Sequence, residues 1–321
     1  MIDSAPARVR LTVLVPCFNE EATLPLLHPR LVAALDGLDA DVRVLYVDDG
    51  SADRTAALVD ALASADPRVA LLKLSRNFGK EIAMSAGLDH AEGDAVVIID
   101  ADLQDPPELV AALFAKFREG YDVVYAVRRS RAGESWLKRS TASAFYRVIG
   151  RLSRTPVPED TGDFRLLSRR AVEALRRLPE QHRFMKGLFG WIGFRQIGVE
   201  YDRAPRAAGE TKWNYWTLWN FAIEGITSFT SAPLRVATYV GLASAVFAFG
   251  YGIFVIIKTM LIGDPVAGYP SLMVVMLFLG GIQLMALGLI GEYLGRLYFE
   301  AKRRPLYLID RYEAARADRP A

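Results

Sequence analysis

Two carboxylates and an amide follow directly after a predicted strand, at Asp100, Asp102 and Gln104. The run before them, 95–99, is wholly apolar, which is typical of a strand that is covered on both faces. Residues two apart in an extended chain point to the same side, so the two carboxylates can face one ligand. Two carboxylates and an amide oxygen suit Mg²⁺ or Mn²⁺, and such a cation suits a diphosphate. The alternative is an Asp pair that caps a helix beginning at 106–108.

Polar loops also follow the other strands of an alternating strand–helix pattern. The predicted strands are 11–15, 42–47, 69–74, 95–99 and 122–126, and the predicted helices are 20–38, 53–65, 80–91 and 107–118. This alternation predicts an α/β domain with a mainly parallel, covered sheet. The loops 16–20, 48–51 and 76–80 should therefore meet Asp100 at one edge, forming a nucleotide-diphosphate cleft lined by carboxylates and a few cations.

Composition narrows the class of protein. The formal net charge of +2 over 321 residues argues against a nucleic-acid partner. Neither the glycine-rich dinucleotide fingerprint nor the phosphate loop of ATPases is present. The single cysteine, Cys17, excludes an internal disulfide and is predicted to be a small buried residue. The three histidines (His28, His90 and His182) are predicted to be ordinary surface residues.

The C-terminal third predicts a membrane anchor. Residues 236–257 and 265–291 each lack charged side chains and are long enough to cross a bilayer as a helix. The short connection at 263–265 lacks Lys and Arg, whereas basic residues flank the outer ends, so both termini should be cytoplasmic. The charged segment 313–321 is expected to fray.

Two basic, aromatic segments precede these spans, at 136–152 and 212–229. Such segments are typical of helices that lie in the membrane interface. The alternative is that they are core-packing helices of the globular domain.

Four motifs make the chain resemble the family 2 glycosyltransferases, which have the GT-A fold. They are Val15-Pro16-x-x-Asn19-Glu20, Asp48-Asp49-Gly50-Ser51, Arg76-Asn77-x-Gly79-Lys80 and Asp100-x-Asp102-x-Gln104. Residues 161–167 and the two spans resemble the polyprenyl-phosphate glycosyltransferases in particular, whereas the Q-x-x-R-W motif of processive synthases is missing. The resemblance implies a GT-A catalytic domain over 1–165, acceptor-site and membrane-interface helices over 166–232, a two-helix transmembrane hairpin over 233–297 and a cytoplasmic tail over 298–321.

The resemblance also implies roles for individual residues. Asp163 matches the catalytic aspartate, and Arg206 and Lys212 match basic residues near the acceptor phosphate. A nucleotide-sugar site is implied at Pro16, Phe18, Glu20, Asp49, Lys80, Asp100 and Arg128. The cation at the end of the fifth strand matches Arg128 or Arg129, and the sequence leaves that choice open. The divalent cation would be held by Asp100, Asp102 and Gln104, with Asp100 facing either the metal or the nucleotide.

The implied activity is the inverting, metal-dependent transfer of a sugar to polyprenyl phosphate, with glucose from UDP-glucose as the first expectation. It would take place at the cytoplasmic face of the inner membrane, in a homo-oligomer that the resemblance makes a tetramer. One alternative is a GDP-mannose-dependent polyprenyl-phosphate mannosyltransferase. Another is a membrane scaffold with an inactive transferase domain.

Overall fold

The computed structural model describes residues 8–129, 161–178, 180–181, 183–201, 232–262 and 268–318. The chain divides into two compact units. One is Met1–Leu218 together with Pro305–Ala321, and the other is Trp219–Arg304. Arg206, Lys212 and both predicted interface segments lie outside the described residues.

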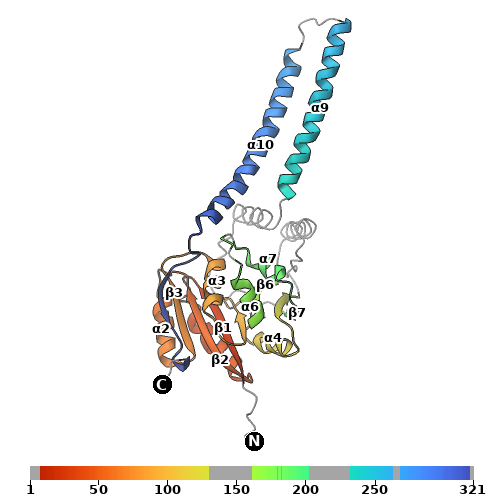
Figure 1. The fold of residues 1–321 in the computed structure, drawn as a ribbon. Coiled ribbons are helices and arrows are strands. Elements are labelled where there is room, and N and C mark those ends of the chain that lie inside the picture. Colours follow the sequence, from red (N-terminus) through yellow and green to blue (C-terminus); the bar gives the residue numbers. More distant parts are fainter. Residues whose placement is uncertain are drawn as a thin grey trace. The chain divides into compact units, whose positions relative to one another are not determined.

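The first unit is built on one mixed sheet with the strand order β7-β5-β6-β4-β1-β2-β3-β8 (Figure 1). The bounds are β1 Val9–Cys17, β2 Ala40–Asp48, β3 Val69–Leu74, β4 Ala95–Ile98, β5 Val123–Arg128, β6 Thr161–Ser168, β7 Gln196–Tyr201 and β8 Ile309–Glu313. Strands β1 to β4 are parallel to their neighbours among themselves, as predicted. Strand β6 lies antiparallel between β4 and β5, which the sequence pattern did not indicate.

The predicted crossover helices are present, with small shifts at their ends. They are α1 Leu24–Asp36, α2 Thr55–Ala65, α3 Lys80–His90 and α4 Leu109–Arg118. Helix α1 shows how they pack, because Leu24, Leu27, Leu31 and Leu35 recur on one face and are buried. Two further helices, α6 Arg169–Arg176 and α7 Met185–Trp191, follow β6, and α6 packs against α3.

The segment after the second span rejoins the sheet. Strand β8 pairs antiparallel with β3, and Lys73 and Arg311 form ion pairs with Asp310 and Asp60 across this edge. Ala315 is buried, and a 3-10 helix, η1, covers Arg316–Asp318. The expectation of fraying from residue 313 is therefore wrong for 313–318, because the open edge of β3 supplies hydrogen-bond partners that the local composition does not reveal.

Two predictions about single residues have different outcomes. Cys17 is buried, which confirms the prediction, and burial raises the pKa of its thiol well above the ordinary value. His28 is buried beside Tyr46, with 3.0 Å between its Nδ1 and the tyrosine hydroxyl, so its assignment to the surface is wrong. The tyrosine hydroxyl satisfies a ring nitrogen, which lets His28 share the core face of α1 with Leu27 and Leu31.

The second unit contains two long apolar helices, α9 Ala232–Ile262 and α10 Tyr269–Lys302, which contact each other. Val236–Phe254 and Phe278–Lys302 are long and apolar enough to cross a membrane. Large apolar side chains such as Phe249 and Met260 are exposed on them, as expected of surfaces that face lipid. Two candidate membrane spans are thus confirmed. The first agrees with the predicted 236–257, whereas the second, Phe278–Lys302, begins and ends later than the predicted 265–291.

Candidate active site

The loops at the carboxyl ends of β1, β2 and β3 are joined by hydrogen bonds, as predicted for one edge of the sheet. The Asn19 backbone N–H donates to Ser51 Oγ at 2.9 Å, and Asn19 Oδ1 accepts from the Ala52 N–H at 2.9 Å. The Asp49 carboxylate accepts from the N–H groups of Phe78 and Gly79, each at 2.8 Å. These bonds hold the three loops together, and the Asp49 carboxylate joins the loop after β2 to the loop after β3.

The residues implied for the nucleotide differ in how they can reach a ligand. Pro16 is buried within β1, whereas the Phe18 side chain is 37% exposed at the rim. The Glu20 carboxylate accepts a hydrogen bond from Thr23 Oγ1. Phe18 therefore offers an accessible aromatic face, while Pro16 shapes the end of the strand.

Lys80 connects Asp100 to Asp163. Its ammonium lies 2.6 Å from Asp100 Oδ1 and 2.6 Å from Asp163 Oδ2. The register explains the meeting: Ile98 of β4 pairs with Arg165 of the antiparallel β6, so Asp100 and Asp163 extend from the same end of that pair. Because Lys80 is the first residue of α3, its charge sits at the positive end of the helix dipole, and the two carboxylates offset that cost.

The two carboxylates differ in their pKa. Burial raises the pKa of Asp100, and Lys80 offsets part of that effect. Burial acts in the same direction on Asp163, but the positive charges of Lys80 and Lys186 outweigh it and hold its pKa below the ordinary value. Asp163 is therefore ionised throughout the neutral range.

The loop after β4 fits a hard cation. Leu103 adopts a left-handed backbone with φ of 59°, and the Gln104 N–H donates to Asp102 Oδ1 at 3.1 Å. Gln104 Oε1 is buried and accepts no hydrogen bond from the part of the chain that the structure describes. No group of three or more His, Cys, Asp or Glu side chains that could hold a metal occurs among the described residues. Two carboxylates with one unsatisfied amide oxygen nevertheless form a set that suits Mg²⁺ or Mn²⁺.

Arg128 is the better placed of the two arginines that end β5. Its Nε lies 3.4 Å from the Tyr201 hydroxyl, which in turn donates to Asp105 beside the cation loop. Gly162 lets the guanidinium lie close, because a β-carbon there would come within 3.1 Å of Arg128 Nη2. Arg129 is exposed and forms an ion pair with Glu200 instead.

Two charged residues of this cluster, Glu81 and Lys186, were not predicted, whereas Arg165 lies in the segment 161–167 that the sequence analysis singled out. Glu81 accepts from the Met185 N–H at 3.1 Å. The buried Arg165 donates to the Gly162 carbonyl at 2.7 Å and lies 3.7 Å from the centre of the Phe189 ring. The contacts of Glu81 with Met185 and of Arg165 with Phe189 join different elements, so the local sequence carries no signal for them.

Comparison with known proteins gives two family matches. Residues 12–176 match the glycosyl transferase family 2, and residues 232–297 match the GtrB C-terminal hairpin. The first match spans most of β1 and all of β2 to β6, with Lys80, Asp100 and Asp163, and the second spans most of the helical hairpin.

Curated relatives match almost the whole chain. An uncharacterised glycosyltransferase of Synechocystis is 54% identical over 94% of this chain and 95% of its own. The bactoprenol glucosyl transferase of Shigella phage SfV is 48% identical over 94% of this chain and 98% of its own. A prophage bactoprenol glucosyl transferase homologue of Escherichia coli is 47% identical over 94% and 99%. The chain is a glycosyltransferase and belongs to glycosyl transferase family 2.

Proposed function

We propose that the protein transfers glucose from UDP-glucose to a polyprenyl phosphate of the undecaprenyl type, with inversion at the sugar. The observation that carries the proposal is the 48% identity to a protein named bactoprenol glucosyl transferase, which covers 94% of this chain. The hairpin belongs to the same kind of protein, since residues 232–297 match the GtrB hairpin. A cleft for a nucleotide diphosphate and two candidate spans suit a soluble donor and a lipid acceptor.

The reaction is a displacement at the anomeric carbon. A phosphate oxygen of the acceptor forms a bond to this carbon, while the bond from the carbon to the UDP oxygen breaks and its electron pair leaves with UDP. A phosphate monoester has a second pKa near 6, so the acceptor is largely dianionic at neutral pH and needs little proton abstraction. Asp163 accordingly acts chiefly by holding Lys80, and only weakly as a base.

Asp100, Asp102 and Gln104 would hold Mg²⁺ or Mn²⁺. The cation would supply positive charge for the departing diphosphate. Phe18, Glu20, Lys80 and Arg128 would serve the donor, with the buried Asp49 holding the loop after β3, and Arg206 and Lys212 would serve the acceptor phosphate. Arginine suits that role because it can bind two phosphate oxygens at once.

The hairpin anchors the enzyme in the cytoplasmic membrane with both termini and the catalytic domain on the cytoplasmic side. The functional division is 1–165 for catalysis, 166–232 for the acceptor, 233–297 for the membrane and 298–321 as a cytoplasmic tail, of which 309–313 return to the sheet as β8. The protein acts as a homo-oligomer, with a tetramer as the expected state.

A transfer assay tests the proposal. Detergent-solubilised full-length protein is incubated with undecaprenyl phosphate, Mg²⁺ and either labelled UDP-glucose or labelled GDP-mannose. We expect label in the lipid from UDP-glucose and loss of transfer with EDTA. Transfer from GDP-mannose alone would make the protein a mannosyltransferase, and absence of transfer from a panel of nucleotide sugars would indicate an inactive scaffold.

A further inference from the structure

Lys186 is a cation of the active-site cluster that no carboxylate neutralises directly. Lys80 lies within 2.6 Å of two carboxylates, and the Arg165 guanidinium donates to a carbonyl. In contrast, no ion pair or hydrogen bond joins the Lys186 ammonium to any residue in the described ranges. The charges of Asp163 and Glu81 act on it from nearby, as do those of Lys80 and Arg165.

The position of Lys186 is fixed by its neighbours along α7. The preceding N–H, that of Met185, donates to Glu81 in the first turn of α3, and Met185 Sδ accepts from Ser85 Oγ at 3.7 Å. Further along α7, Phe189 is buried under the guanidinium of Arg165. The start of α7 is thus fastened to the helix whose first residue bridges Asp100 and Asp163. Lys186 is held beside the reacting groups by packing on both sides.

A half-buried ammonium with no direct counter-ion is costly, and an anion that reaches it recovers part of that cost. Burial lowers the pKa of Lys186, although the charges of Asp163 and Glu81 act in the opposite direction. An arriving phosphate oxygen would supply the missing contact and keep the ammonium protonated. The Lys186 ammonium is therefore positioned in advance to bind the negative charge of a substrate phosphate.

We propose that Lys186 is a phosphate-binding residue of the transferase site. Its ligand is a phosphate oxygen, either of the donor diphosphate or of the lipid acceptor. The inference rests on the proposed function, because that reaction brings both phosphates to this cluster. Lys186 differs from Lys80 in role: Lys80 orders two carboxylates of the protein, and Lys186 contacts the substrate.

The test uses Lys186→Met, which keeps the length of the side chain and removes the charge, and Lys186→Arg, which keeps the charge. Lys116→Met is the matched control, since Lys116 is an exposed lysine that pairs with Glu119 on α4. Detergent-solubilised full-length variants are assayed for KM with UDP-glucose and with undecaprenyl phosphate. Binding of UDP with Mn²⁺ is measured separately by calorimetry.

We expect Lys186→Met to raise one KM about 10-fold or more, Lys186→Arg to recover most of the loss, and Lys116→Met to match the wild type. A weaker UDP affinity assigns the contact to the donor, whereas an unchanged UDP affinity with a raised acceptor KM assigns it to the lipid phosphate. Unchanged KM values and UDP affinity in an active Lys186→Met protein would overturn the inference. The inference would also be overturned if Lys186→Met and Lys186→Arg lose activity equally and both have lower thermal midpoints, because the loss would then come from instability of the fold. A wild-type protein that binds UDP with Mn²⁺ but transfers no glucose would refute the proposed function, and the UDP affinities would still test Lys186.

Discussion

The two ends of helix α3 present opposite solutions to the same problem, the unpaired groups at a helix terminus. At the first residue, Lys80 places a positive charge where the helix dipole opposes it and relies on Asp100 and Asp163. Buried oxygen atoms of Asp163 and Gln104 accept no hydrogen bond from the described chain. Oxygen atoms at this end of α3 can therefore accept bonds from a ligand.

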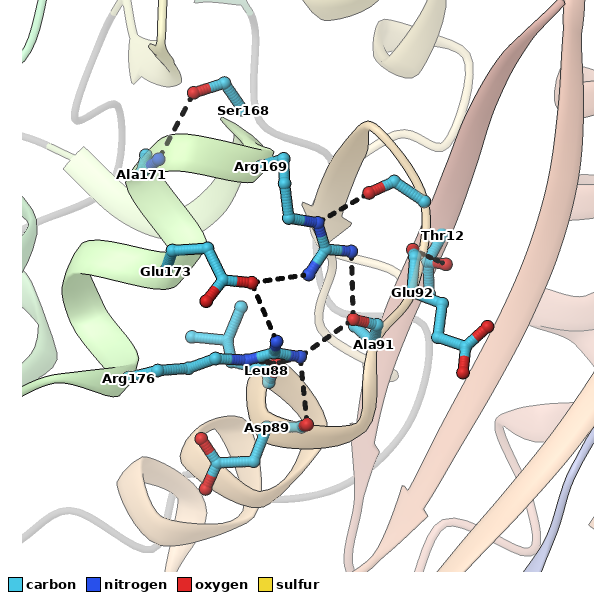
Figure 2. Close-up of polar contacts among 11 residues, drawn as sticks. Thr12, Leu88, Asp89, Ala91, Glu92, Ser168, Arg169, Ala171, Glu173 and Arg176 are labelled. Carbon is cyan, nitrogen blue, oxygen red and sulfur yellow. Dashed lines mark hydrogen bonds and ion pairs between the residues drawn. The ribbon is translucent and has the colours of Figure 1, made fainter.

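The other end is closed by arginines. Arg176 donates to the carbonyls of Leu88, Asp89 and Ala91, and Arg169 donates to those of Ala91 and Gly93 (Figure 2). Glu173 lies between the two guanidinium groups, 3.0 Å from Arg176 and 3.5 Å from Arg169. Positive charge at this end agrees with the dipole.

The difference shows how one helix serves both stability and chemistry. The capped end fixes α3 against α6, which leaves the first turn free to carry charges that the fold alone does not need. Buried polar atoms without partners are uncommon in folded proteins, so their concentration around Lys80 indicates a place for ligands. Substitutions at the first turn should change catalysis, and substitutions at the capped end should change only stability.

The largest expected effect follows from Asp163→Asn. The change keeps the shape of the side chain and removes one of the two charges that hold Lys80, so we expect kcat to fall on the order of 10²–10³-fold. Because the pKa of Asp163 is already low, the acidic limb of the pH–rate profile should come from the acceptor phosphate, near pH 6, and should persist in the variant. Transfer rates from pH 5 to 9 provide the measurement.

Asp310→Asn is the control for this experiment, because Asp310 pairs with Lys73 at 2.8 Å at the β8 edge of the sheet. It should retain wild-type kinetics. An acidic limb that is present in the wild type and absent in Asp163→Asn would show that Asp163 is the base.

The sequence predicted the end of α3 that lies at the candidate site, but not the end that the arginines cap. The apolar runs and the polar loops after them predicted which strand ends meet at one edge of the sheet, because both signals depend on local periodicity and turn residues. They also predicted that Lys80, Asp100 and Asp102 lie close together at this edge. The capped end was not predicted, since Arg176 meets α3 only through tertiary packing 88 residues away in sequence. Strand β8 was missed for the same reason: its pairing with β3 is decided by an open edge and not by its own composition.

A smaller effect on the site is expected from Tyr201→Phe. The hydroxyl holds Arg128 and donates to Asp105, so its loss frees the guanidinium and leaves a buried carboxylate without that donor. One lost hydrogen bond to a charged group corresponds to roughly 1.5–3 kcal/mol, which converts to about 10- to 150-fold in affinity. We expect the KM for UDP-glucose to rise by about 10-fold, the lower end of this range, and kcat to change less.

Tyr312→Phe is a suitable control because Tyr312 lies in β8, away from the cleft. An unchanged KM for UDP-glucose in Tyr201→Phe would show that donor binding by Arg128 does not depend on its hydrogen bond to Tyr201.

Glu81→Gln should show how the charge of this side chain in the first turn of α3 affects stability, because glutamine keeps its shape. Burial, followed by the charge of Asp163, raises the pKa of Glu81 to about 8. The folded protein therefore binds this proton more tightly than the unfolded chain, and the stability is lost as pH rises through about 8. Glutamine can keep the bond from the Met185 N–H without becoming charged. Near pH 4 the two proteins should have similar thermal midpoints. Between about pH 4.5 and 8 the wild type should lose stability relative to the variant, so that at pH 9 the variant is more stable by several kcal/mol.

Glu119→Gln, at the residue that follows α4, removes an exposed acid that pairs with Lys116 and controls for the general loss of one negative charge. Equal slopes of thermal midpoint against pH in wild type and Glu81→Gln would mean that folding does not raise the pKa of Glu81.

The smallest effect on the enzyme is expected at the capped end, with Arg176→Met. The variant loses the donor to three carbonyls, but Arg169 still caps Ala91, and water can reach the freed carbonyls because the Arg176 side chain is 26% exposed (Figure 2). We expect a loss of about 1 kcal/mol, or 2–4 °C in thermal midpoint, and kinetic constants within twofold of the wild type at temperatures well below that midpoint. A kcat that falls more than 10-fold without a change in thermal midpoint would show that the two ends of α3 act together, since the position of Lys80 would then depend directly on how the carbonyls of Leu88 and Asp89 are held.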